Sequence, residues 1–118
     1  MVLVVDDDKD LLEMLGLVFG RADVPHILAA SLGAVQAHDP AQLSLVHTAI
    51  LDVNLGPSQP SGLDVATWLR GQGYAPKIVF ITGHAPDHPL VRAIAGEHGE
   101  VLEKPVRMRV LLDLVREQ

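Results

Sequence analysis

The chain has 118 residues, 48% of them hydrophobic, and a formal net charge of −6. This composition predicts one globular domain over residues 1–118 and excludes an intrinsically disordered chain. The acidic balance argues against direct nucleic-acid binding, and the absence of cysteine excludes a disulfide framework and a thiolate metal site. No apolar run reaches the length of a membrane span and no signal peptide precedes the first strand, so we expect a cytoplasmic protein without membrane contact.

Short apolar runs alternate with amphipathic segments along the whole chain. The apolar runs predict five strands, at about Val2–Val5, His26–Ala30, Thr48–Val53, Lys77–Ile81 and Val101–Glu103. The segments between them predict helices at about Lys9–Phe19, Gly62–Arg70, His88–Ala95 and from Arg107 onward, with a second helix that begins after Ser31. Residues 40–47 are ambiguous. The alternation predicts an α/β fold, a single doubly wound domain with a parallel sheet, right-handed crossovers and helices on both faces.

Two of these helices carry an apolar stripe at helical spacing, which we expect to face the core. In the first helix the stripe is Leu11, Met14, Leu15 and Val18, and in the last helix it is Val110, Leu111 and Leu114. Gly20 is placed to end the first helix. Ser31 is a candidate N-cap for the second helix, which Asp39-Pro40 should interrupt.

Four of the predicted strands end in polar residues that phosphoryl chemistry can use. In chain order these are Asp6, Asp7 and Asp8, then Asp52, then Thr82, then Lys104-Pro105. Ligands of open parallel sheets bind at the carboxyl ends of the strands, so one edge of the sheet would gather all of these residues. Such a group suits a divalent cation, an aspartyl phosphate and its counter-charges.

Taken singly, each residue also has an ordinary structural explanation. Carboxylates ahead of a helix commonly cap it, and Asp8 is our candidate for that role. However, carboxylates ~4 Å apart repel by about 4 kcal/mol at an effective dielectric constant of about 20, and a hard cation such as Mg²⁺ removes that repulsion. A buried Asp52 would need a partner or a chemical role. Thr82 alone would be a turn hydroxyl and Lys104 alone a surface charge.

Five segments, in this order, resemble the receiver domain of two-component response regulators, such as the chemotaxis response regulator. They are VLVVDDD at 2–8, AILDVNL at 49–55, SGLDV at 61–65, IVFITGHA at 78–85 and VLEKPV at 101–106. The resemblance covers nearly the whole chain. It implies a flavodoxin-like sheet with the strand order 2-1-3-4-5.

The resemblance also implies a reaction. Asp52 would accept a phosphoryl group from a phosphohistidine on a sensor histidine kinase or a histidine phosphotransfer protein. Mg²⁺, or Mn²⁺, would be held by Asp7 directly, by Asp6 through water, by Asp52 and by the backbone carbonyl of Asn54. Thr82 and Lys104 would hydrogen-bond the phosphoryl oxygens. The domain would catalyse its own phosphorylation and dephosphorylation and would not be an enzyme with a separate substrate.

Four further positions would modulate this reaction. Gly83 would let the phosphoryl group come close to Thr82, and a cis bond before Pro105 would aim the Lys104 ammonium inward. His84 would tune the lifetime of the phosphate. Val101 departs from the family, which carries an aromatic residue there, so the domain would either switch by another packing change or mainly relay phosphate.

Several alternatives stay open beside this interpretation. One is a receiver that is not phosphorylated and serves as a docking or dimerisation module. Another is a phosphatase of the haloacid dehalogenase type, although that family carries its nucleophile on the first strand. A flavodoxin is excluded because no phosphate-binding loop follows the first strand. An output domain or a homodimer would use the face formed by the fourth helix, fifth strand and fifth helix.

Overall fold

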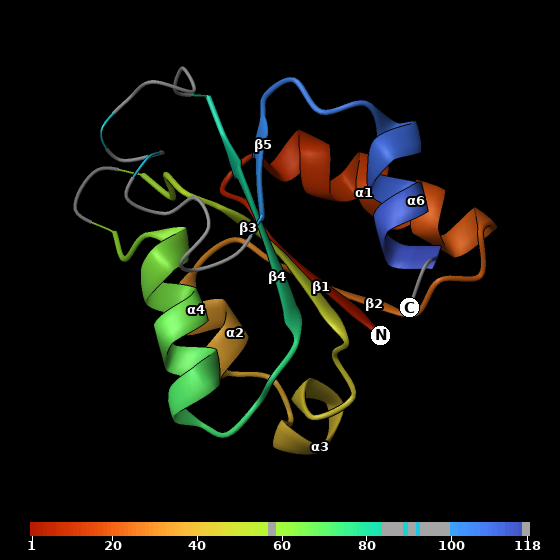
Figure 1. Cartoon of the computed structure of the whole chain (residues 1–118). Helices are drawn as coiled ribbons and strands as arrows, with labels where there is room; N and C mark the ends of the chain where they lie inside the picture. Colours follow the sequence, from red (N-terminus) through yellow and green to blue (C-terminus); the bar gives the residue numbers. More distant parts are fainter. Residues whose placement is uncertain (57–58, 84–88, 90–91, 93–99, 117–118) are drawn as a thin grey trace.

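A five-stranded parallel sheet forms the centre of the molecule (Figure 1). The computed structural model describes residues 1–56, 59–83, 89, 92 and 100–116. The strands are β1 (Val2–Val5), β2 (His26–Ala29), β3 (Thr48–Asp52), β4 (Lys77–Thr82) and β5 (Glu100–Glu103). They lie in the order β2-β1-β3-β4-β5, and every neighbouring pair is parallel. The predicted fold class and strand order are therefore confirmed.

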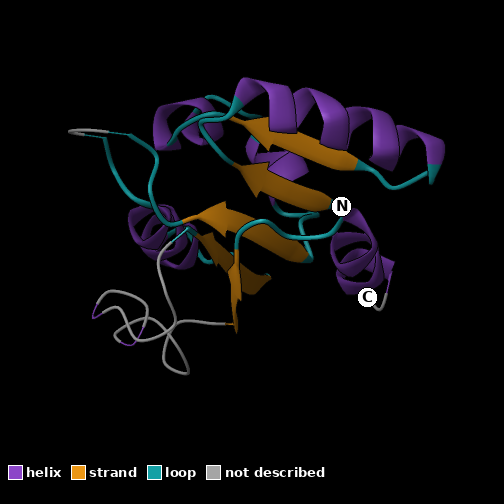
Figure 2. Cartoon of the chain, turned by 90° about the horizontal axis from the view of Figure 1, so that it is seen from above, coloured by secondary structure: helices purple, strands orange, loops and turns teal. Residues whose placement is uncertain are grey.

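Helices cover both faces of this sheet (Figures 1 and 2). The described helices are α1 (Lys9–Arg21), α2 (Leu32–Gln36), α3 (Pro40–Leu43), α4 (Gly62–Gly71) and α6 (Met108–Arg116). One core joins α1 and α6 to the sheet, and the other joins α2, α3 and α4 to its opposite face. None of these helices is both long and apolar enough to cross a bilayer.

The two cores follow from the alternation of side chains along each strand. On β1, Leu3 and Val5 pack into the core of α2 and α4, whereas Val2 and Val4 pack into the core of α1 and α6. Every residue of β1 and of β3 is buried, as expected for central strands covered on both faces. These apolar strands are therefore rigid supports for whatever follows their carboxyl ends.

The helix starts agree with the sequence. Asp8 caps α1, and its carboxylate accepts hydrogen bonds from the backbone N–H groups of Asp10 and Leu11, at 3.1 and 3.2 Å. Ser31 caps α2. Residues 40–43, ambiguous in the sequence, form α3, with Asp39 as its cap and Pro40 in its first turn.

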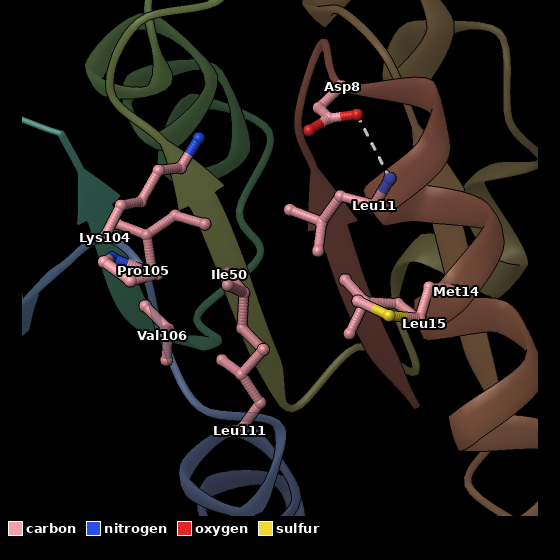
Figure 3. Close-up of a pocket in the computed structure, with 10 residues that line it drawn as sticks. Asp8, Leu11, Met14, Leu15, Ile50, Lys104, Pro105, Val106 and Leu111 are labelled. Carbon is pink, nitrogen blue, oxygen red and sulfur yellow. Dashed lines mark hydrogen bonds between the residues drawn. The ribbon is translucent and has the colours of Figure 1, made fainter.

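Three local predictions are wrong. Gly20 does not end α1, which runs to Arg21, and the left-handed residue that follows is Asp23 (φ 57°). Met14 is 47% exposed, since it borders an open pocket (Figure 3). Val110 is 40% exposed because Leu111 and Val115 form the face of α6 that packs on the sheet. The predicted helix at 88–95 falls mostly outside the described residues.

Candidate functional site

The site lies at the carboxyl edge of the sheet, where parallel pairing brings the strand ends together. The pairing continues past β1, because the Asp6 N–H donates to Ala29 O at 3.1 Å. It also continues past β3 and β5, with Val53 N–H donating to Ile81 O at 2.9 Å and Lys104 N–H to Thr82 O at 2.7 Å. The backbone that carries the polar residues is thus held by the sheet itself.

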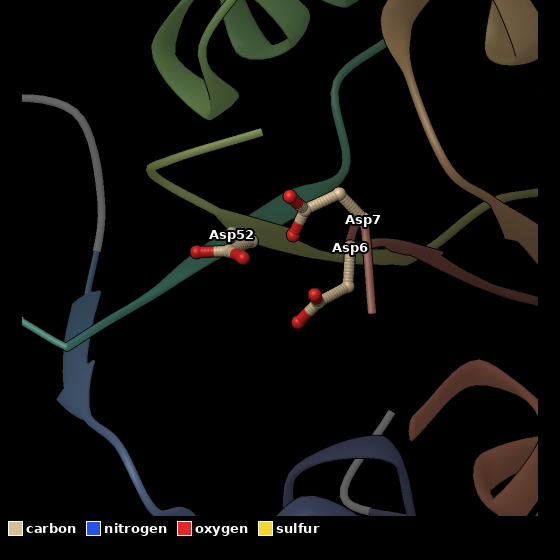
Figure 4. Close-up of side chains that lie close together, drawn as sticks. All are labelled: Asp6, Asp7 and Asp52. Carbon is tan, nitrogen blue, oxygen red and sulfur yellow. The ribbon is translucent and has the colours of Figure 1, made fainter. Parts of the chain in front are cut away.

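Three carboxylates meet at this edge (Figure 4). One oxygen each from Asp6, Asp7 and Asp52 lies within 4.8 Å of the others. Asp6 and Asp52 are buried, whereas Asp7 is exposed. Their separation brings the charges close enough to repel strongly unless a cation or a proton is shared among them.

Lys104 directly follows the carboxyl end of β5, and its side chain reaches the same cluster. Its ammonium Nζ lies 3.0 Å from Asp52 Oδ2, to which it donates a hydrogen bond, and 3.3 Å from Asp6 Oδ2. The bond between Lys104 and Pro105 is cis, as the family resemblance implies. With three carboxylates and one ammonium, this group of four residues keeps an excess of negative charge.

Burial and the neighbouring charges shift the pKa values of this pair. Burial raises the pKa of Asp52 to about 6; the hydrogen bond from Lys104 opposes this rise, and the charge of Asp6 adds to it. Burial lowers the pKa of Lys104, but its hydrogen bond and charge contacts with Asp52 and Asp6 outweigh that effect and raise it overall. Asp52 therefore takes up a proton more readily than an ordinary aspartate, and a further positive charge in the pocket would favour its ionised form.

The donor set fits a hard divalent cation. Asp6 Oδ2 is buried and accepts no hydrogen bond from the part of the chain that the structure describes, so beyond its ion pair with Lys104 it has spare capacity as a ligand. A pocket of about 320 Å³ opens beside the carboxylates and is lined by Asp7, Asp52, Asn54, Gly83 and Lys104. Carboxylate and carbonyl oxygens around a small polar space are typical of magnesium or manganese sites.

A short loop after β3 shapes one wall of this pocket. The Asn54 N–H donates to Asp52 Oδ1 at 3.2 Å, and the Gly56 N–H donates to Asn54 Oδ1 at 3.1 Å. Gly56 has a φ of 114°, which favours glycine. The two turns orient the Asp52 carboxylate and bring Asn54 to the rim of the pocket.

Most of the predicted site residues are brought together by the fold. Thr82 is buried at the end of β4, one position past the residue that pairs with Asp52. Val101 packs, partly buried, against the core of α2 and α4. His84 lies outside the described residues.

An apolar pocket of about 490 Å³ adjoins the carboxylate site (Figure 3). It lies between α1 and the segment after β5, and its walls include Leu11, Met14, Pro105 and Val106. Lys104 lines both pockets. Sequence reasoning missed this pocket, because it treated Met14 as a core residue.

Sequence reasoning also gave no role to Gly62, the first residue of α4. It is buried against the backbone of Asp52. A glycine directly after the N-cap Ser61, where most residues would serve, was the signal available in the sequence.

Comparisons with known proteins agree with this geometry. The family model described as the response regulator receiver domain matches residues 2–116. The chain is 33% identical over 115 residues to the C4-dicarboxylate transport transcriptional regulatory protein DctR of Rhodobacter capsulatus, covering 96% of this chain and 56% of that protein. It is 32% identical over 116 residues to the response regulator protein TmoT of Ectopseudomonas mendocina, covering 98% and 51%. The chain thus spans about half the length of these relatives.

Solved structures share the fold. The chemotaxis protein CheY4 of Vibrio cholerae superposes with a TM-score of 0.78 at 24% identity, covering 98% of this chain and 95% of that one. The receiver domain of NtrX from Brucella abortus superposes with a TM-score of 0.77 at 22% identity, covering 99% and 96%. Because the family model matches nearly the whole of this chain, the chain belongs to the response regulator receiver domain family.

Proposed function

We propose that this chain is a phosphoacceptor domain of a two-component phosphorelay, with Asp52 as the acceptor. The observation that carries the proposal is the contact of a buried Asp52 carboxylate with Lys104, beside two further carboxylates and an open polar pocket. A buried acid at the end of a central strand is unfavourable for folding, so a chemical role accounts for its presence.

In the proposed reaction, an Asp52 carboxylate oxygen forms a bond to phosphorus. The phosphorus–nitrogen bond of a phosphohistidine breaks, and the imidazole leaves with its electron pair and takes up a proton. The Lys104 ammonium would donate a hydrogen bond to one phosphoryl oxygen as negative charge develops on it, and the Thr82 hydroxyl would donate to another. Gly83 leaves open space at the rim, since no atom of the described residues lies within 4 Å of a Cβ placed there.

Asp6, Asp7, Asp52 and the carbonyl of Asn54 would hold Mg²⁺ or Mn²⁺. The bound cation would neutralise the carboxylates and the transferring phosphoryl group. The spare capacity of Asp6 Oδ2 and the excess of acids over ammonium groups support this assignment.

The phosphoryl donor in this proposal is a sensor histidine kinase or a histidine phosphotransfer protein in the cytoplasm. The apolar pocket between α1 and Val106 supports a protein donor, because it offers Leu11 and Met14 next to the acceptor site. The phosphorylated domain would act on an output domain or a further relay partner. His84 and Val101 would modulate phosphate lifetime and switching, and Pro105 would set the direction of Lys104.

A docking module that is never phosphorylated is the second candidate. It would explain the fold and the presence of Val101 where the family carries an aromatic residue. It gives no reason for the acidic cluster, with its two buried carboxylates, or for its ion pair. A phosphatase of the haloacid dehalogenase type is disfavoured because Asp52 is the last residue of β3 and does not lie on the first strand.

Intact mass measurement tests the proposal. Wild type and Asp52→Asn are incubated with acetyl phosphate and Mg²⁺, with and without excess EDTA. We expect a gain of one phosphoryl group in wild type that requires both Asp52 and the cation. Folded wild type that gains no mass from acetyl phosphate, and none from a histidine kinase either, would favour the docking module.

A further inference from the structure

The first residue of α4 lies directly against the backbone of the proposed acceptor. A Cβ built on Gly62 would overlap the carbonyl oxygen of Asp52 and lie 2.9 Å from its carbonyl carbon and 3.3 Å from Val53 Cα. All three neighbours are backbone atoms, so no change of rotamer could relieve the contact. Any side chain at position 62 therefore requires the end of β3 or the start of α4 to move.

Because the start of α4 lies so close to the end of β3, the helix can hydrogen-bond the peptide group between Val53 and Asn54. The Gly62 N–H donates to Val53 O at 3.1 Å. The N–H of the same peptide, that of Asn54, donates to Asp52 Oδ1 at 3.2 Å. The Val53–Asn54 peptide is thus fixed between the helix and the acceptor carboxylate, and the Asn54 carbonyl comes directly after it.

The helix is itself well anchored. Ser61 and Asp64 form a capping box, in which the Ser61 N–H donates to Asp64 Oδ2 at 2.8 Å and the Asp64 N–H donates to Ser61 Oγ at 3.4 Å. Its buried face, Val65 and Leu69, packs into the core against the sheet. A side chain at Gly62 would therefore press directly on the backbone of Asp52 and Val53 at the end of β3.

We propose that Gly62 is a positioning residue of the phosphoacceptor site. Because it lacks a side chain, α4 reaches the Val53–Asn54 peptide and so sets the orientation of the Asp52 carboxylate and of the Asn54 carbonyl. The inference rests on the proposed function, because it concerns the same acceptor and cation site. Gly62 acts through Asn54 and touches no reacting atom.

The test compares the same substitution at the two ends of α4. Gly62→Ala introduces the clash, whereas Gly71→Ala is the control, since within the described ranges no atom lies within 4 Å of a Cβ there. Mg²⁺ affinity is measured by calorimetric titration and the rate of phosphorylation by acetyl phosphate through intact mass. We expect Gly62→Ala to bind Mg²⁺ about tenfold to a hundredfold more weakly and to react more slowly, because such losses are typical when groups that orient metal ligands are disturbed. Gly71→Ala should match wild type in both.

A purely structural role predicts a different outcome. It would lower the stability of Gly62→Ala but leave the Mg²⁺ affinity of the folded protein and its phosphorylation rate unchanged, and that result would overturn the proposal. If Gly62→Ala alone does not fold, the substitution is repeated together with Gly20→Ala and Gly71→Ala, two open helical positions where alanine favours the helix.

The wild-type protein provides a test that needs no variant. During a titration with Mg²⁺ followed by ¹⁵N–¹H spectra, the amide signals of Gly62 and Asn54 should shift together, because one peptide links them. A shifted Asn54 signal with an unchanged Gly62 signal would contradict the proposal. Failure of the proposed function would look different, since wild type itself would then gain no phosphoryl group.

Discussion

Lys104 shows how much a single side chain depends on the fold around it. Its side chain is 33% exposed, yet its ammonium contacts two carboxylates that are almost completely buried. The two carboxylates come from the ends of β1 and β3, and Asp52 alone lies 52 residues before Lys104 in the chain. The residue type was evident in the sequence, but its charge partners were predicted only through the assumed parallel sheet.

Replacing Lys104 with alanine should impair the reaction more than the fold. We expect phosphorylation by acetyl phosphate to slow by roughly 10²-fold, because a charged donor to the phosphoryl oxygens is lost. The free energy of unfolding without metal should fall by about 1–3 kcal/mol, since buried carboxylates lose their partner. Lys77→Ala, which removes an exposed lysine at the other end of the sheet, serves as control. An unchanged rate in Lys104→Ala would show that Lys104 has no role in the reaction.

At the scale of elements, the spacing of apolar residues predicted which segments are helical. It assigned some residues, however, to the wrong face of their helix. In α6 the predicted stripe is Val110, Leu111 and Leu114, whereas the structure buries Leu111 and Val115 and packs Leu114 partly buried against the core. The helix turns 100° per residue, so a nine-residue helix allows two faces that differ by one position. Packing against β4 and α1 decides between them. Met14 is likewise exposed, because it lines the open pocket between α1 and the segment after β5.

This correction predicts a contrast between neighbouring residues of α6. Leu111 is 2% exposed, so Leu111→Ala should lower the free energy of unfolding by about 2–5 kcal/mol through lost burial and a cavity. Val110→Ala, on the exposed side, should change it by about 0.5 kcal/mol or less. Denaturant titration of both variants measures the difference. Equal losses would mean that α6 packs with another face.

At the scale of the whole molecule, the sheet holds several acids at one edge at some expense of stability. The pKa of Asp52 rises from its ordinary 3.8 to about 6 in the folded protein. The folded state therefore binds this proton more tightly than the unfolded state. The resulting stabilisation is fully present below about pH 4 and is lost as the pH rises through about 6.

Without metal, protonation of Asp52 should add to the free energy of unfolding on acidification from pH 7 to pH 5. The Asp52 contribution to this gain is roughly 1 kcal/mol, from the size of the pKa shift. Asp52→Asn should lack that component, and the difference between the two profiles isolates the contribution of Asp52. Denaturant titrations in EDTA at both pH values measure it. Parallel profiles would show that the pKa of Asp52 is not raised.

The sequence alone determined the fold class, the strand order through the family resemblance, and the edge at which the polar residues meet. It could do so because apolar strand runs and capping residues are local signals, and a parallel sheet places every strand's carboxyl end on one side. Only the tertiary structure decided the exposure of Met14 and Val110, the raised pKa of Asp52 and the contact of Gly62 with the acceptor backbone. Those properties depend on distances between segments far apart in the chain, which no local pattern contains.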